Sequence, residues 1–133
     1  MAKILYLHGF ASSANSTKAL QLKKYIFKNY SKTEIIIPNI ENNIVDAVQQ
    51  IDNLIKEFSP SALIGSSLGG FYATYFSEQY NLKCVGINPA VIPPAEMSEY
   101  LGENKNYSTG EKFLITQEQL DLLDRMGKEI KVI

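Results

Sequence analysis

The chain has 133 residues, which is enough for one domain with one hydrophobic core and short for two. Its formal net charge of −1 and its pI of about 5.8 exclude the basic footprint of a nucleic-acid-binding protein. No apolar run reaches the ~18 residues that a membrane-spanning helix needs. We therefore expect neither a nucleic acid nor a membrane as a partner.

From the amino terminus, short apolar runs that predict buried strands alternate with longer segments of helical periodicity. In chain order these are a strand at Lys3–Leu7, a helix at Thr17–Tyr30, a strand at Glu34–Pro38, a helix at Ile44–Phe58, a strand at Ala62–Ile64, a helix at Leu68–Tyr80 and a strand at Lys83–Asn88. Serines at residues 11–16 can cap the first helix, and Asn42 or Asn43 can cap the second.

After Asn88 the alternation loosens, and residues 94–115 form an excursion that we expect near the substrate entrance. Within it, Ala95–Leu101 can form a short helix, and Gly102–Gly110 is polar and is not expected to join the core. A capping box, Thr-x-x-Gln, predicts a helix at Thr116–Met126 with Gly127 as its stop, and Glu129–Ile133 is β-like.

This order predicts one domain over residues 1–133, a three-layer α/β/α sandwich around a mostly parallel sheet of about five strands. Ligands of such folds bind beyond the carboxyl ends of the strands. His8, Ser66-Ser67 and Asn88-Pro89 all follow strand ends, so we expect them on one edge. The single cysteine, Cys84, is expected in the core, and its lack of a disulfide partner indicates a reducing, cytoplasmic compartment.

Residues Gly65 to Gly69 match the pattern G-x-S-x-G between a predicted strand and a predicted helix. In this context the middle residue, Ser67, occupies a strained turn that lifts its hydroxyl above the sheet as a nucleophile. The N–H of Leu68, at the helix start, can stabilise an oxyanion. A plain helix cap with close-packed glycines is the competing interpretation. No P-loop or dinucleotide fingerprint occurs, and we expect neither a cofactor nor a metal.

His8-Gly9-Phe10 follows the first predicted strand. The second N–H donor of an acyl-transfer site usually comes from a loop after a neighbouring strand, so the Phe10 N–H is the candidate. Gly9 lets the backbone turn toward the substrate. His8 is the only histidine, and we expect it to support its own loop by hydrogen bonds rather than to activate Ser67.

Four stretches, LYLHGFASSANSTKA, GSSLGGFYATY, INPAVIP and YLGENKNYSTGE, together resemble the YqiA-like esterases, a branch of the α/β-hydrolase superfamily. The resemblance implies an α/β-hydrolase-like fold, a small acyl ester as substrate, Ser67 as nucleophile and the Phe10 and Leu68 N–H groups as oxyanion hole. It also implies that Asn88–Pro94 and residues 100–115 line or cover the entrance.

The departure from the family concerns the acid and the histidine of the triad, which follow the serine in α/β-hydrolases. No histidine follows Ser67 here, and Asp121 and Asp124 are interpreted as solvated helix charges. The chain resembles the amino-terminal two-thirds of the family fold, so we expect an impaired esterase and self-association through an exposed sheet edge. The alternative is a non-catalytic α/β module that binds a small anion at the elbow.

Overall fold

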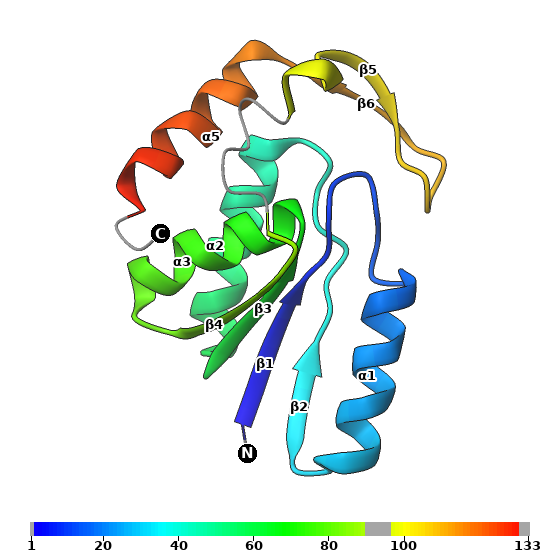
Figure 1. Ribbon diagram of the computed structural model, residues 1–133, viewed down its shortest axis with the longest axis vertical. Coiled ribbons are helices and arrows are strands. Elements are labelled where there is room, and N and C mark those ends of the chain that lie inside the picture. Colours follow the sequence, from blue (N-terminus) through cyan, green and yellow to red (C-terminus); the bar gives the residue numbers. More distant parts are fainter. Residues whose placement is uncertain (1, 90–96, 131–133) are drawn as a thin grey trace.

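A four-stranded parallel sheet forms the centre of the molecule, whose computed structural model describes residues 2–89 and 97–130 (Figure 1). The strands are β1 (Ala2–Leu7), β2 (Thr33–Ile36), β3 (Ala62–Ser66) and β4 (Lys83–Ile87), in the spatial order β2-β1-β3-β4. All three pairings are parallel. The strand order turns around between β1 and β3, which places their carboxyl ends at the ligand-binding edge of such sheets.

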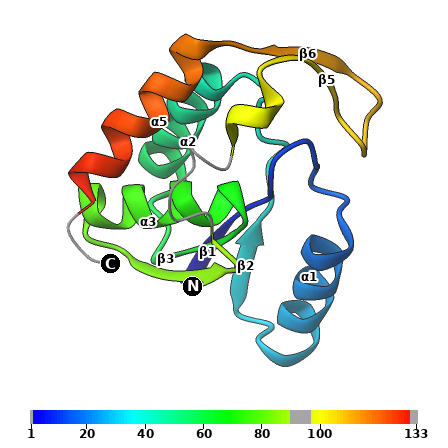
Figure 2. The same cartoon turned by 45° about the horizontal axis from the view of Figure 1, so that its top comes forward.

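Helices cover the two faces of this sheet unequally, as Figures 1 and 2 show. The long helices are α1 (Thr17–Asn29), α2 (Ile44–Phe58), α3 (Leu68–Tyr80) and α5 (Gln117–Glu129). Three of them, α2, α3 and α5, lie on one side, and α1 lies on the other beside β2. The predicted α/β/α class is confirmed. None of the described helices combines the length and apolar character that a bilayer crossing demands.

The core lies between the sheet and the three helices of the fuller side. The helical periodicity predicted for Ile44–Phe58 is confirmed as an apolar stripe, because Ile44, Ile51 and Ile55 are buried in one core cluster with the sheet residues Leu5 and Leu63. Asn43 caps this helix, since its side chain accepts a hydrogen bond from the Asp46 N–H at 3.0 Å. The helix therefore begins at Ile44, where the stripe begins.

The polar excursion contains a two-stranded antiparallel sheet that the sequence analysis did not predict. Strand β5 (Gly102–Lys105) pairs with β6 (Lys112–Ile115), and a single 3-10 turn, η1 (Ser98–Tyr100), precedes them. Figures 1 and 2 show this hairpin above the carboxyl ends of β1 and β2. Of the helix predicted at Ala95–Leu101, the described part is helical at Met97 and continues as η1, and residues 95 and 96 lie outside the described residues.

One expectation about α5 was wrong, and another is confirmed only in part. Gly127 does not end the helix, which continues to Glu129 because a glycine with ordinary helical backbone angles costs only about 1 kcal/mol relative to alanine. The capping box is half formed. Thr116 accepts from the Gln119 N–H, but Gln119 directs its own side chain to the Ile44 N–H and the Leu114 carbonyl. The buried amide thus joins α5 to the start of α2. Of the fifth strand predicted at Glu129–Ile133, Glu129 is helical and residues 131–133 lie outside the described residues.

The expectation for Cys84 was also wrong, because the cysteine is exposed. It belongs to β4, which is the edge strand of the four described ones, and the side chains of that strand are largely exposed on both faces. Val85 keeps 56% of its surface. A buried position predicted from an apolar strand requires a neighbouring strand on each side, and β4 has one only on the β3 side within the described residues.

Candidate active site

Ser67 stands at a sharp reversal between β3 and α3. Its backbone angles are φ 56° and ψ −120°, a conformation that costs a non-glycine residue about 1–3 kcal/mol. The Ser67 N–H donates to the Ile87 carbonyl at 3.0 Å, and its own carbonyl accepts from the N–H of Gly70 at 2.9 Å. The side chain is exposed. The preceding serine, Ser66, is buried and hydrogen-bonds with the Tyr6 phenol.

Two glycines make room for this reversal. A Cβ on Gly65 would lie 2.1 Å from the Gly69 carbonyl oxygen, and a Cβ on Gly69 would lie 2.1 Å from the Leu7 carbonyl oxygen. Both contacts are with backbone atoms that cannot move without shifting a strand or a helix. The glycines of G-x-S-x-G are therefore required by the close approach of the start of α3 to β3 at Gly65 and to the end of β1 at Gly69.

The loop after β1 runs alongside Ser67. A Cβ built on Gly9 would lie 3.2 Å from the Ser67 Cβ and 3.8 Å from its Oγ, so Gly9 and Ser67 are direct neighbours. The next residue, Phe10, carries one of the two N–H groups predicted to bind an oxyanion, and Leu68, directly after Ser67, carries the other. Among the described residues, no acceptor is paired with either N–H.

His8 uses both of its ring nitrogens within the protein. Its Nδ1–H donates to the Gly9 carbonyl at 2.8 Å, and its Nε2 accepts from the Ile40 N–H at 2.8 Å. These bonds fix the neutral tautomer, and burial lowers the pKa of the ring below its usual 6.5 against the opposing effect of the Gly9 bond. With its lone pair engaged at Ile40, His8 connects the loop after β1 to the segment before α2.

Asn88 and Pro89 close the end of β4 on the other side of the elbow. Asn88 has a left-handed backbone, with φ 46°. Pro89 packs against α3, and a Cβ on Gly70 would lie 2.7 Å from the Pro89 Cβ. Both residues are exposed. The structure thus brings the ends of β1, β3 and β4 together, with Ser67 between the two flanking loops.

Aromatic rings gather over the Phe10 loop. The Phe10 ring lies 4.8 Å from the ring of Tyr100 and 5.5 Å from that of Phe113, measured between centroids. The hollow beside Phe10 and Leu68 is only about 10 Å³ in volume, about the size needed by one water molecule. The described residues therefore provide an apolar wall beside the elbow.

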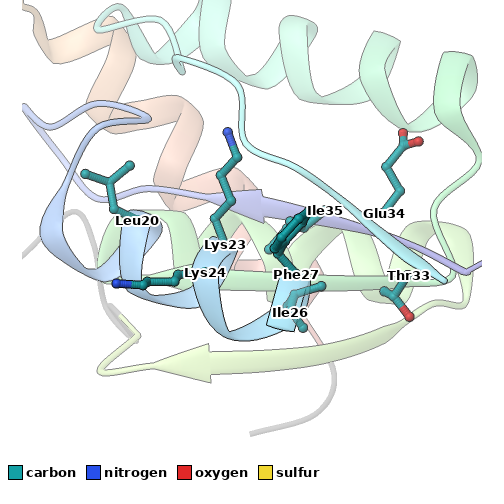
Figure 3. A pocket seen from close by; sticks show the side chains of 8 residues that line it. All are labelled: Leu20, Lys23, Lys24, Ile26, Phe27, Thr33, Glu34 and Ile35. Carbon is teal, nitrogen blue, oxygen red and sulfur yellow. The ribbon is translucent and has the colours of Figure 1, made fainter. Parts of the chain in front are cut away.

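A larger hollow, about 450 Å³, lies between α1 and β2 (Figure 3). Its lining includes Leu20, Phe27 and Ile35, together with the lysines at 23 and 24. None of the residues around Ser67 lines it. This hollow reflects the thin cover on the α1 side of the sheet and is separate from the candidate site.

The two aspartates after Ser67 have their partners within helix α5. Asp121 and Asp124 lie on the exposed side of α5, where Gln117 donates to Asp121 at 3.0 Å and Lys128 pairs with Asp124 at 3.1 Å. Among the described residues, no group of three or more histidine, cysteine or acidic side chains could hold a metal ion. The site as described is a serine with neighbouring backbone donors.

The sequence analysis missed the contribution of Asn106, which is buried at the tip of the β5–β6 hairpin and hydrogen-bonds to the loop after β1. The signal that could have found the hairpin is the apolar run Lys112–Ile115 following the turn residues Ser-Thr-Gly.

The sequence of the chain matches a known protein family. The model of the uncharacterised protein family UPF0227 matches residues 3–130. The chain belongs to this family. A UPF0227 protein from Pectobacterium atrosepticum is 28% identical over 108 residues, which are 78% of this chain and 59% of that protein. The chain therefore spans about three-fifths of the length of this UPF0227 relative, and the resemblance to YqiA-like esterases is confirmed at the level of the family.

Solved structures share the fold. Est1E from Butyrivibrio proteoclasticus, solved with ferulic acid bound, superposes with a TM-score of 0.71 at 10% identity, over 94% of this chain and 61% of that one. The mouse α/β-hydrolase domain-containing protein 10 gives 0.66 at 15% identity, over 93% and 61%. The UPF0227 chain thus has an α/β-hydrolase fold over the part that it spans.

Proposed function

We propose that this UPF0227 chain carries the nucleophile and the oxyanion hole of a serine hydrolase that acts on small acyl esters. The observation that supports this most strongly is Ser67, an exposed hydroxyl on a strained backbone directly beside Gly9. Strain of this kind persists only where the surrounding structure requires it, and it concentrates at functional sites. The fold shared with Est1E is consistent with this chemistry.

In the proposed reaction the Ser67 Oγ attacks the ester carbonyl carbon. The carbonyl oxygen becomes an oxyanion that accepts hydrogen bonds from the Phe10 and Leu68 N–H groups, aided by the positive end of the α3 dipole. The proton of Ser67 passes to a base and then to the departing alcohol. Water hydrolyses the resulting acyl-serine and releases the carboxylic acid.

The proposed reaction needs a base that takes the proton of Ser67, and His8 is not placed to be that base. The one histidine of the sequence, His8, accepts a hydrogen bond from Ile40 at the nitrogen that would take the proton. In subtilisin, loss of the histidine costs about 2 × 10⁶ in kcat, with roughly 10³–10⁴ over water left from the oxyanion hole and binding. We therefore propose that these 133 residues alone hydrolyse esters weakly, through Ser67 and the two N–H donors.

The test is the hydrolysis of p-nitrophenyl acetate by the chain and by two matched variants. Ser67→Ala is expected to remove the protein-dependent rate, and Ser66→Ala is expected to retain it because Ser66 is buried and bonded to Tyr6. A Ser67→Ala variant as active as the wild type would refute the proposed nucleophile. Fast turnover that depends on Ser67 would refute the claim that the base is missing.

A second candidate function follows from the two N–H groups that have no acceptor among the described residues. In this alternative the site binds a carboxylate or another small anion without chemistry, as helix N-termini do. Acetate binding that shifts the Phe10 and Leu68 amide resonances equally in the wild type and in Ser67→Ala, with no Ser67-dependent hydrolysis, would favour this alternative.

A further inference from the structure

The β5–β6 hairpin holds the loop that carries the Phe10 N–H. The Tyr107 N–H donates to the Ala11 carbonyl at 3.0 Å, and the Asn106 Nδ2 donates to the Ser12 carbonyl at 2.9 Å. The Ser108 hydroxyl also hydrogen-bonds with that of Ser13. Three successive residues of the hairpin tip thus contact three successive residues after Phe10, although the two segments are more than ninety positions apart.

Asn106 uses its side chain to full capacity. Only 2% of its surface is exposed. Its Oδ1 accepts from the N–H groups of Ser108 and Thr109, both at 2.9 Å, which shapes the turn of the hairpin. Its Nδ2 donates to Ser12 and also to the Asn42 Oδ1 at 2.9 Å. The oxygen therefore serves the hairpin itself, and the nitrogen serves the neighbouring segments.

The loop needs this support because of its own backbone. Ala11 is buried and has φ 56°, a left-handed conformation that an alanine adopts at a cost of about 1–2 kcal/mol. Ala11 directly follows Phe10, so relaxation of its backbone would turn the Phe10 N–H. The bonds from Tyr107 to Ala11 and from Asn106 to Ser12 oppose that relaxation.

We propose that Asn106 is a positioning residue that holds the Phe10 N–H toward Ser67 through the Ser12 carbonyl. The bonds from residues 106–108 to residues 11–13 are here called the clamp. The inference rests on the proposed function, because the clamp is taken to position one donor of the oxyanion hole. Asn106 does not touch the reacting atoms. Its effect is on the direction of one backbone donor, and a donor turned away from the oxyanion stabilises it little.

The decisive variant is Asn106→Asp, which keeps the acceptor oxygen for Ser108 and Thr109 and removes both Nδ2 donors. The control is Asn104→Asp, which makes the same change two residues away. The Asn104 Nδ2 donates only within its own segment, to the Tyr100 and Gly102 carbonyls at 2.6 and 3.1 Å. The pair separates the clamp from the general effect of an added charge in the hairpin.

Two measurements are made on each variant: hydrogen exchange of the Tyr107 amide, and the rate at which an alkyl fluorophosphonate labels Ser67. For Asn106→Asp we expect Tyr107 exchange at least tenfold faster and Ser67 labelling about tenfold slower, part of the roughly 10²–10³ that a lost oxyanion donor costs. Exchange in α2 and α3 stays unchanged. Asn104→Asp is expected to label within about twofold of the wild type.

Ser108→Ala, which loses only the hydroxyl contact with Ser13, serves as a milder second variant should Asn106→Asp open the whole fold. It is expected to shift both measurements in the same direction, by a smaller factor. Unchanged Tyr107 exchange in Asn106→Asp overturns the clamp. Faster exchange with unchanged labelling overturns the positioning role. Absence of Ser67 labelling in the wild type overturns the proposed function and, with it, the role of Asn106 in catalysis.

Discussion

The two faces of the central sheet differ in how completely this chain covers them. On the side of α2, α3 and α5, the sheet residues Leu5 and Leu63 have no exposed surface. On the side of α1, Phe27 keeps 84% of its surface and the edge residue Val85 keeps 56%. The side covered by α2, α3 and α5, here called the closed side, carries the helix that begins at Leu68, directly after Ser67, so the candidate site depends on this half of the structure.

The side of the sheet that faces α1, here called the open side, has apolar surface that the described residues do not cover. Helix α1 buries only Ala19 and Ile26 of its thirteen residues, and it leaves the hollow of Figure 3 beside it. The UPF0227 relative from Pectobacterium is longer than this chain. We propose that the open face and the β4 edge associate with a second copy of this chain.

The largest effect is expected on the closed side, at the crossing of α3 and β1. Gly69→Ala places a Cβ 2.1 Å from the Leu7 carbonyl oxygen, so we expect a loss of about 3 kcal/mol or more in the free energy of unfolding. The matched control is Gly127→Ala in α5, where the new Cβ would be 3.8 Å from Phe71. That variant is expected to gain up to about 1 kcal/mol. Urea denaturation of both variants measures the difference in the free energy of unfolding. Equal values would contradict the close contact between α3 and β1 at Gly69.

A smaller effect is expected on the open side, in the association of the chain. Val85→Lys puts a charge on the exposed edge strand, where lysine blocks edge-to-edge pairing. We expect light scattering to show an assembly for the wild type and a monomer for this variant. Val45→Lys, on the exposed surface of α2, is the control and should associate like the wild type. A monomeric wild type at high concentration would exclude the proposed contact.

The smallest effect concerns the pH dependence of the loop after β1. Burial lowers the pKa of His8 in the folded chain, so the unfolded chain binds the proton more readily. The stability that the neutral ring provides is therefore present above about pH 6.5 and is lost as the pH falls from there through the folded pKa. Protonation also breaks the Ile40 bond.

Urea denaturation between pH 8 and 5 tests this expectation against the His8→Gln variant, which cannot titrate. The wild type should lose stability on acidification, by an amount on the order of one buried hydrogen bond, about 1 kcal/mol. The variant should lack this part of the slope. Identical slopes for the two proteins would mean that His8 titrates normally in the folded chain.

The sequence predicted the closed side better than the open side or the hairpin. The bounds of α3, Leu68–Tyr80, were predicted correctly because the glycine pattern before the helix and the apolar strand after it define them locally. Cys84 was misplaced because its burial depends on a neighbouring strand, which periodicity cannot reveal. Asn106 was missed because a buried asparagine in a polar stretch looks like a turn until the distant Ser12 carbonyl is known.

Titration with methylboronic acid, followed by the amide ¹⁵N resonances of the chain, tests the central claim most directly. A boronic acid bonds to a serine oxygen, which loses its proton to solvent, and forms a tetrahedral anionic boronate that places a hydroxyl oxygen in the oxyanion hole. We predict that the Phe10 and Leu68 amides shift together with saturation and that Ser67→Ala abolishes both shifts. Saturable shifts that persist in Ser67→Ala, or an adduct on Ser67 that leaves the Phe10 amide unchanged, would contradict the account.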